Sequence, residues 1–139
     1  MIDIENSTSF QPRVNMLKKI TTSLTKKDVE LIITTDEQIC LINKEFRNID
    51  KPTDVLSFPI SQSKYSPLGS IIISKDRVLD VAKELGHSEY EEFELLYIHG
   101  LLHLLGLDHE KDGGKMRKKE SELIKKFNLP QSLIVRGES

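Results

Sequence analysis

Residues 95–105 read LLYIHGLLHLL, a run that is apolar at every position except His99, Gly100 and His103. A helix that is apolar on nearly every side is either the centre of a protein core or part of a membrane span. The run has roughly half of the ~20 residues that a bilayer needs, and two ionisable side chains lie inside it. We therefore predict a buried central helix, which begins with the capping-box sequence SEYE at residues 88–91.

Hydrophobic periodicity on both sides of this helix predicts alternating short strands and amphipathic helices. Strands are expected at residues 2–5, 29–34, 55–58 and 69–74, and further helices at 12–24, 35–46, 75–85 and 114–127. In the helix at 35–46, Ile39, Ile42 and Phe46 should face the core, and residues 47–53 should form a loop. This order predicts an α+β fold, with a small mixed sheet of about four strands covered by helices.

Length and composition limit the class of protein. The 139 residues have room for one hydrophobic core, so we expect a single domain over residues 1–139. Twenty basic against 22 acidic residues give a net charge of −2, which excludes a broad positive surface field. The single cysteine, Cys40, excludes an intrachain disulfide framework and a cysteine-based zinc cluster. The chain begins without a signal peptide pattern, and with one cysteine it suits the cytoplasm.

Three of the four histidines are spaced like the ligands of one metal ion. His99 and His103 are four residues apart on a predicted helix, so their side chains share one face, about 40° and roughly 6 Å apart. Gly106 allows a sharp turn after the helix, which can return His109 to the same point. Three imidazoles leave a fourth tetrahedral position for water, as in a catalytic zinc site. We expect one Zn²⁺ per chain, although nickel, iron and copper also accept such ligands.

The alternative for any single buried histidine is an ordinary hydrogen-bonded core residue. Two of them in one apolar helix, without a shared partner, would leave costly unsatisfied polar groups. His87 lies in a turn before the central helix, and we expect it to make a structural hydrogen bond. Asp108 either orients a ligand imidazole or caps the turn, and the sequence favours neither role.

A water molecule activated by such a metal could attack a peptide carbonyl or a phosphodiester. The histidine spacing is similar to the metzincin signature, in which a glutamate after the first histidine is the general base of a metalloprotease. Here that position is Gly100. Peptide hydrolysis by that mechanism is therefore disfavoured, and a small metalloprotease remains only as the weakest rival.

Three segments of the chain together resemble one known family. Residues 99–109 (HGLLHLLGLDH) and 43–59 (NKEFR followed by DKPTDVLSFP) closely resemble the YbeY family of bacterial endoribonucleases and rRNA maturation factors, and residues 68–71 (LGSI) are a weaker match. The resemblance implies a zinc ion held by His99, His103 and His109. It also implies metal-dependent cleavage of single-stranded RNA, in maturation of the 16S rRNA 3′ end and in ribosome quality control. RNA and the ribosome or small-subunit proteins would be the partners, with no membrane and no DNA specificity.

The family's functionally important arginine corresponds to Arg47. An arginine aimed at the cleft could bind a phosphate with two hydrogen bonds and stabilise the charge of the transition state. Without the resemblance, the same residue would be interpreted as a solvated loop arginine. The chain departs from the family at Ser70, where an aspartate is usual, so any role of that carboxylate is missing or moved.

Any RNA-binding surface must be local, because the net charge is slightly negative. Lys111, Lys115 and Lys118 follow the third histidine and are spaced as on one helix face, which suits steering of phosphates. A charge run is more often a solvated face, and no aromatic platform for base stacking is evident. The non-catalytic alternative is a ribosome assembly factor in which zinc stabilises the histidine-bearing turn.

Overall fold

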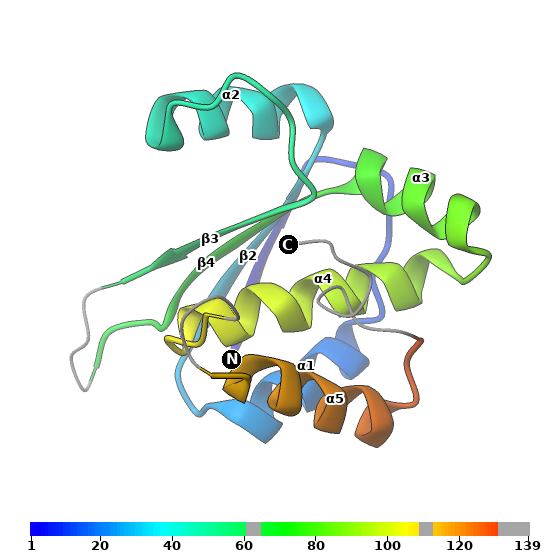
Figure 1. Ribbon diagram of the computed structural model, residues 1–139. Helices are drawn as coiled ribbons and strands as arrows, with labels where there is room; N and C mark the ends of the chain where they lie inside the picture. The colour runs from blue at the N-terminus through cyan, green and yellow to red at the C-terminus, as the bar shows by residue number, and fades with distance from the viewer. Residues whose placement is uncertain (61–64, 109–112, 131–139) are drawn as a thin grey trace.

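The computed structural model describes residues 1–60, 65–108 and 113–130 of the chain (Figure 1). Within these ranges the strands are β1 (Ile2–Asn6), β2 (Val29–Thr34), β3 (Val55–Pro59) and β4 (Gly69–Ser74). The helices are α1 (Val14–Leu24), α2 (Asp36–Arg47), α3 (Lys75–Leu85), α4 (Glu89–Leu104) and α5 (Lys115–Phe127). Each predicted strand and helix is present, with its ends within two residues of the predicted positions.

The four strands form one mixed sheet in the order β1-β2-β4-β3. β1 and β4 each pair with β2 in parallel, whereas β3 pairs with β4 antiparallel. β3 is thus an edge strand, and Pro59, which lacks a backbone N–H, is tolerated at its end. The predicted α+β fold with a four-stranded mixed sheet is confirmed.

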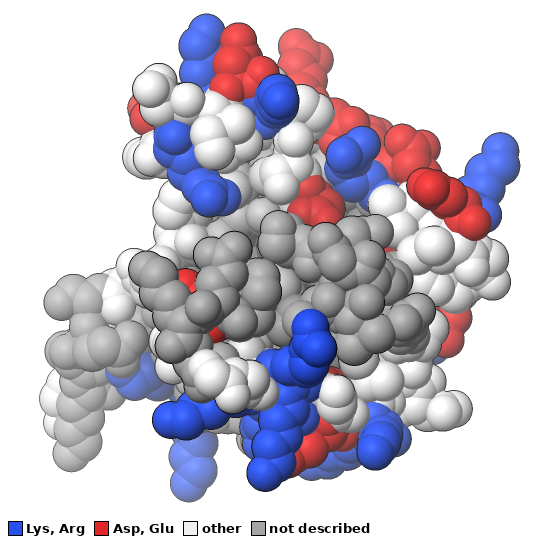
Figure 2. Space-filling view, in the orientation of Figure 1, with Lys and Arg blue, Asp and Glu red and all other residues white. Residues whose placement is uncertain are grey.

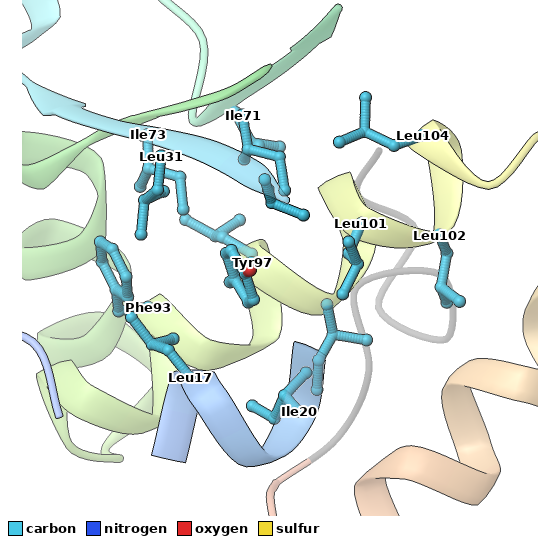
Figure 3. Close-up of a cluster of buried hydrophobic side chains, with 14 of the residues drawn as sticks. Leu17, Ile20, Leu31, Ile71, Ile73, Phe93, Tyr97, Leu101, Leu102 and Leu104 are labelled. Carbon is cyan, nitrogen blue, oxygen red and sulfur yellow. The ribbon is translucent and has the colours of Figure 1, made fainter. Parts of the chain in front are cut away.

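The main core lies between one face of the sheet and helices α1, α4 and α5 (Figures 1 and 3). Helix α4 is at its centre, and every residue from Glu92 to Leu102 is buried. The core combines side chains of the sheet, α1 and α4, among them Leu17, Ile20, Leu31, Ile71, Ile73, Phe93, Tyr97 and Leu101. The predicted buried central helix is confirmed. In the described part of the chain, no helix is long and apolar enough to cross a membrane.

Helix α2 covers the opposite face of the sheet, where Ile39 packs with Leu56 and Ile72. The expectation that Phe46 faces the core is wrong, because 65% of this residue is exposed. The second apolar cluster is small, and Phe46 lies beyond it, with its ring edge-on to Phe58 of β3 at 5.6 Å between centroids.

Helix α2 also continues one residue further than predicted and includes Arg47. It ends at Asn48, which adopts the left-handed conformation (φ 56°) and donates its backbone N–H to the Lys44 carbonyl at 3.1 Å. Arg47 therefore belongs to the last turn of a helix, not to a loop.

Candidate metal centre

Helix α4 carries two histidines into the protein because its sequence gives it no polar face. Its start is stabilised by the predicted capping box: Ser88 Oγ accepts from the Glu91 N–H at 3.1 Å, and Glu91 accepts from the Ser88 N–H at 3.0 Å. The hydrogen bond from the Ser88 backbone lowers the pKa of Glu91. The helix then passes through the core, and the histidines lie near its other end.

The structure brings the predicted ligands His99 and His103 together. Their Nε2 atoms are 3.2 Å apart, and their rings meet at 84° with centroids 4.7 Å apart. His99 is 1% exposed and His103 is half-buried, so the pair reaches from the core towards the surface. Two nitrogens that each lie about 2.0–2.1 Å from one tetrahedral ion would be roughly 3.4 Å apart, so the observed spacing fits shared ligation.

The turn after α4 determines which nitrogen of His103 is available. Gly106 has φ 92°, a conformation that favours glycine, and the chain folds back so that the Leu107 carbonyl lies 3.0 Å from His103 Nδ1. A carbonyl only accepts, so Nδ1 carries the proton and Nε2 keeps its lone pair. This is the tautomer that a metal ligand needs, directed towards His99.

The rest of the predicted ligand set is only partly described. His109 lies outside the described residues, and among those described no three ligand-type side chains come together. Asp108 is half-buried just before it, and its two possible roles stay open. The two imidazoles fit zinc and similar divalent ions by their chemistry and spacing.

Position 100, where a metzincin-type protease has its glutamate, has no room for a side chain unless its neighbours move. A Cβ atom on Gly100 would lie 2.9 Å from Ile71 Cγ2 and 3.1 Å from Ser57 Oγ. The position faces the sheet, and both contacts are closer than ordinary van der Waals distance. The geometry thus strengthens the argument against peptide hydrolysis by that mechanism.

A buried acid that the sequence analysis did not single out lies beside the histidine pair. Glu120 of α5 is 1% exposed, and its Oε2 is 3.5 Å from His99 Nδ1. A sequence signal was nevertheless present, because Glu120 shares the apolar face of α5 with Met116 and Leu123.

Arg47 does not lie on the same side of the sheet as the histidines. It is exposed at the end of α2, whereas His99 and His103 belong to α4 on the other face (Figure 1). Both helix ends are nevertheless near the end of β3. The α2 end contacts Phe58, and a Cβ on Gly69, the partner of Pro59, would lie 2.7 Å from Leu104 Cδ2. Arg47 is therefore across the edge strand from the histidine pair.

The basic residues of α5 lie on the surface. Lys115 and Lys118 are exposed, and Lys111 lies outside the described residues. Figure 2 shows lysine and arginine gathered along the lower edge of the view, where α1 and α5 lie. These two lysines are thus available to a negatively charged ligand.

Ser70, where the family usually has an aspartate, lies on the α2 face of the sheet. Its hydroxyl donates to Glu30 Oε1 at 2.7 Å, and the two residues are register partners in β4 and β2. A carboxylate is therefore present at this place, supplied by the neighbouring strand.

Two further ionisable groups lie at the other end of α4. His87 Nε2 is 2.7 Å from Glu92 Oε1, which confirms the expected structural hydrogen bond of His87. A depression of about 600 Å³ between α3 and the start of α4 is lined by His87, Leu79 and Tyr90, away from the histidine pair.

Asp54, just before β3, has a shifted pKa. Burial raises this pKa, and the hydrogen bond that the Val55 N–H donates to the carboxylate at 2.8 Å lowers it.

A small α+β protein with two facing imidazoles on its central helix belongs to the class of candidate metalloproteins. Comparison with known proteins names the family: residues 2–128 match the family model described as Endoribonuclease YbeY, and the chain belongs to this family. Similar relatives include proteins called Endoribonuclease YbeY from Aliarcobacter butzleri, 59% identical over 139 residues, and from Nautilia profundicola, 56% identical over 138 residues. Each alignment covers 99% of both chains.

The fold is also similar to a solved structure. The solution structure of a Thermotoga maritima protein superposes with a TM-score of 0.63 at 26% sequence identity. The match covers 91% of this chain and 89% of the other.

Proposed function

We propose that this protein is a metal-dependent endoribonuclease that cleaves single-stranded RNA, in maturation of the 16S rRNA 3′ end and in ribosome quality control. The observation that supports it most is the pair of Nε2 atoms 3.2 Å apart on a buried helix, in a chain whose relatives are called endoribonucleases. A cytoplasmic location and binding to RNA and small-subunit components belong to the same proposal.

His99, His103 and His109 are the proposed ligands of one Zn²⁺ or similar ion. When bound, such an ion polarises a phosphate oxygen and lowers the pKa of a bound water molecule. The carbonyl of Leu107 holds the ring of His103 in the orientation that presents Nε2. His103 is half-buried, so it is the member of the pair nearer to the surface, from which substrate would approach.

Arg47 would bind the RNA from the other side of the edge strand. A strand of RNA that crosses the end of β3 would pass between Arg47 and the histidine pair. The planar guanidinium can donate two hydrogen bonds to one phosphate and stabilise its developing charge. Lys115 and Lys118 would attract the phosphates before cleavage.

The test measures bound metal and cleavage of a labelled single-stranded RNA, with a duplex of the same sequence for comparison. His103→Ala should lose metal and cleavage together. Arg47→Ala should keep the metal and lose cleavage, and Arg47→Lys should recover little, because lysine cannot form the paired hydrogen bonds. Arg77→Ala, an exposed arginine of α3, is the matched control and should behave like the wild type.

Cleavage that is equal in all variants would mean a contaminating nuclease and would contradict the proposal. The rival assembly factor makes a different prediction. Metal-loaded protein would then bind ribosomal subunits without cleaving RNA, and His103→Ala would lose binding or unfold.

A further inference from the structure

Glu120 is a charged residue in an unusual place. It is 1% exposed and lies with Met116 and Leu123 on the face of α5 that packs into the core. Within the described part of the chain, neither of its carboxylate oxygens has a hydrogen-bond partner. Burial of a carboxylate without compensation is strongly unfavourable. A residue that only fills this space would be apolar, so the carboxylate itself needs an explanation.

A ring nitrogen of a proposed metal ligand lies close to this carboxylate. Glu120 Oε2 lies 3.5 Å from His99 Nδ1, and both side chains are 1% exposed. The other nitrogen of the same ring, Nε2, faces His103 Nε2 at 3.2 Å. A small shift of either side chain would shorten the 3.5 Å separation to a hydrogen bond.

The second histidine has the same arrangement. His103 Nδ1 lies 3.0 Å from the carbonyl of Leu107, and its Nε2 also points to the space between the rings. Each ring thus has an oxygen acceptor behind Nδ1 and directs Nε2 at its partner. The acceptor of His103 is neutral, whereas that of His99 carries a charge.

We propose that Glu120 is the positioning residue of this site: it accepts the Nδ1–H of His99, holds the ring with Nε2 free for the metal, and raises metal affinity by its charge. The inference depends on the proposed function, because it assigns Glu120 a role toward the same ion. Carboxylates behind ligating histidines make the imidazole a better ligand. A bound divalent cation would in turn compensate the buried negative charge.

The charge predicts opposite effects on the apoprotein and on metal binding. Without metal, the buried carboxylate is a cost, so Glu120→Gln and the apolar Glu120→Leu should unfold at the same urea concentration as wild type or a higher one. With metal, both should bind more weakly, by about 10–100-fold, with Leu worse than Gln because only Gln can still accept from Nδ1. A purely structural role predicts the reverse: lower stability and unchanged affinity.

The experiment measures the dissociation constants of Zn²⁺ and Co²⁺ by competition with a chelating indicator, and urea unfolding of the apoprotein. The ¹⁵N spectrum of the imidazoles gives a readout that needs neither metal nor activity. Nδ1 of His99 in the wild-type apoprotein should show the ¹⁵N signature of an N–H that donates to a carboxylate. Glu120→Leu should lose this signature, because Nε2, which faces the lone pair of His103, then carries the proton of the ring. Glu122→Gln, an exposed glutamate of the same helix, is the matched control and should match wild type in all three measurements.

The outcomes separate this inference from the proposed function. Wild-type affinity and an unchanged His99 tautomer in Glu120→Leu would overturn the inference and leave the nuclease proposal intact. Weakened metal binding in these variants, in a protein that never cleaves RNA, would support the inference and contradict the nuclease. A wild-type protein that binds no divalent metal would overturn both.

Discussion

The hydroxyl of Ser57 donates a hydrogen bond to the backbone carbonyl of Gly100 at 3.2 Å, which joins the edge strand β3 to the middle of α4. This approach is possible because Gly100 has no side chain, since a Cβ there would meet Ile71 and Val55 as well as Ser57. The glycine after the first histidine therefore serves close packing of helix on sheet, and it holds His99 at a fixed depth in the core.

Gly100→Ala should destabilise the protein despite the better helix propensity of alanine. Overpacking against buried Ile71 costs about 1–3 kcal/mol, and replacement of glycine inside a helix returns about 1 kcal/mol. We expect a net loss of about 1 kcal/mol in the free energy of unfolding, measured by urea denaturation. In an Ile71→Ala background the same substitution should be neutral or stabilising. The Cγ2 atom of Ile71, which would lie 2.9 Å from the new Cβ of residue 100, is absent there. Equal losses in both backgrounds would contradict the packing explanation.

Arg13→Ala should destabilise the protein in a pH-dependent way. Arg13 donates to both oxygens of Glu94 at 2.9 and 2.6 Å, and Glu94 is 1% exposed. Breaking a buried pair costs about 3–5 kcal/mol, but 45% of the Arg13 side chain is exposed, so we expect about 2 kcal/mol at pH 7. Arg77→Ala is the control for the loss of an exposed arginine.

The sign of the pH effect follows from the pKa of Glu94, which burial raises and Arg13 lowers, with burial the larger influence. A carboxyl whose folded pKa is above its unfolded value, about 4.3, contributes stability that is present at lower pH and lost as pH rises through the folded pKa. Removal of Arg13 raises the folded pKa further. The deficit of Arg13→Ala relative to wild type, measured by urea unfolding, should therefore grow between pH 4 and pH 7. A deficit that is independent of pH would show that the ion pair is not its cause.

Thr21→Val should cost more stability than Tyr97→Phe, because it removes two buried hydrogen bonds and Tyr97→Phe removes one. The two hydroxyl oxygens are 2.6 Å apart, and Thr21 also donates to the Leu17 carbonyl at 2.7 Å. Tyr97→Phe leaves Thr21 with that carbonyl and should cost about 0.5–1.5 kcal/mol, whereas Thr21→Val strands the Tyr97 hydroxyl and should cost about 1–3 kcal/mol. Thermal unfolding of both variants checks the order, and the reverse order would contradict it.

Burial raises the pKa of Tyr97 to about 12, with the Thr21 hydrogen bond acting in the opposite direction. The phenolate of Tyr97 should therefore be absent from the ultraviolet spectrum of the folded protein at pH 10. Tyr97→Phe is the control, because the difference between its spectrum and that of the wild type isolates the signal of the Tyr97 ring. A difference spectrum in which Tyr97 ionises below pH 10 would contradict its burial.

Charge reversal of Lys115 and Lys118 should weaken RNA binding without loss of metal. If each lysine contacts one phosphate of a single strand, the slope of log affinity against log salt should fall by about 0.7 per contact removed. Lys115→Glu/Lys118→Glu should raise KM for single-stranded RNA and leave kcat unchanged, as expected for steering. Lys83→Glu on α3 is the control. If it raised KM as much as the double variant does, the effect would come from the net charge of the protein and not from contacts of Lys115 and Lys118 with RNA.

Much of the fold could be predicted because local signals and the buried environment agree. The run Ile71-Ile72-Ile73 forms a strand with both faces covered, and Ser88 with Glu91 begins α4 as the capping box requires. The exposed position of Phe46 was not predictable. Its spacing places it on the apolar face of α2. Phe46 would be buried only if the sheet extended beneath the last turn of the helix, and the periodicity of α2 does not indicate the extent of the sheet.

By itself the sequence determined the elements, the buried central helix and the shared face of His99 and His103, because each depends on residues close together in the chain. Only the tertiary structure decided that Glu120 lies behind His99 and that Arg47 lies across the edge strand. These relationships join residues from different helices, and their positions depend on how the helices pack on the two faces of the sheet. Local periodicity indicates which face of a helix is buried, but not which residues of another helix that face meets.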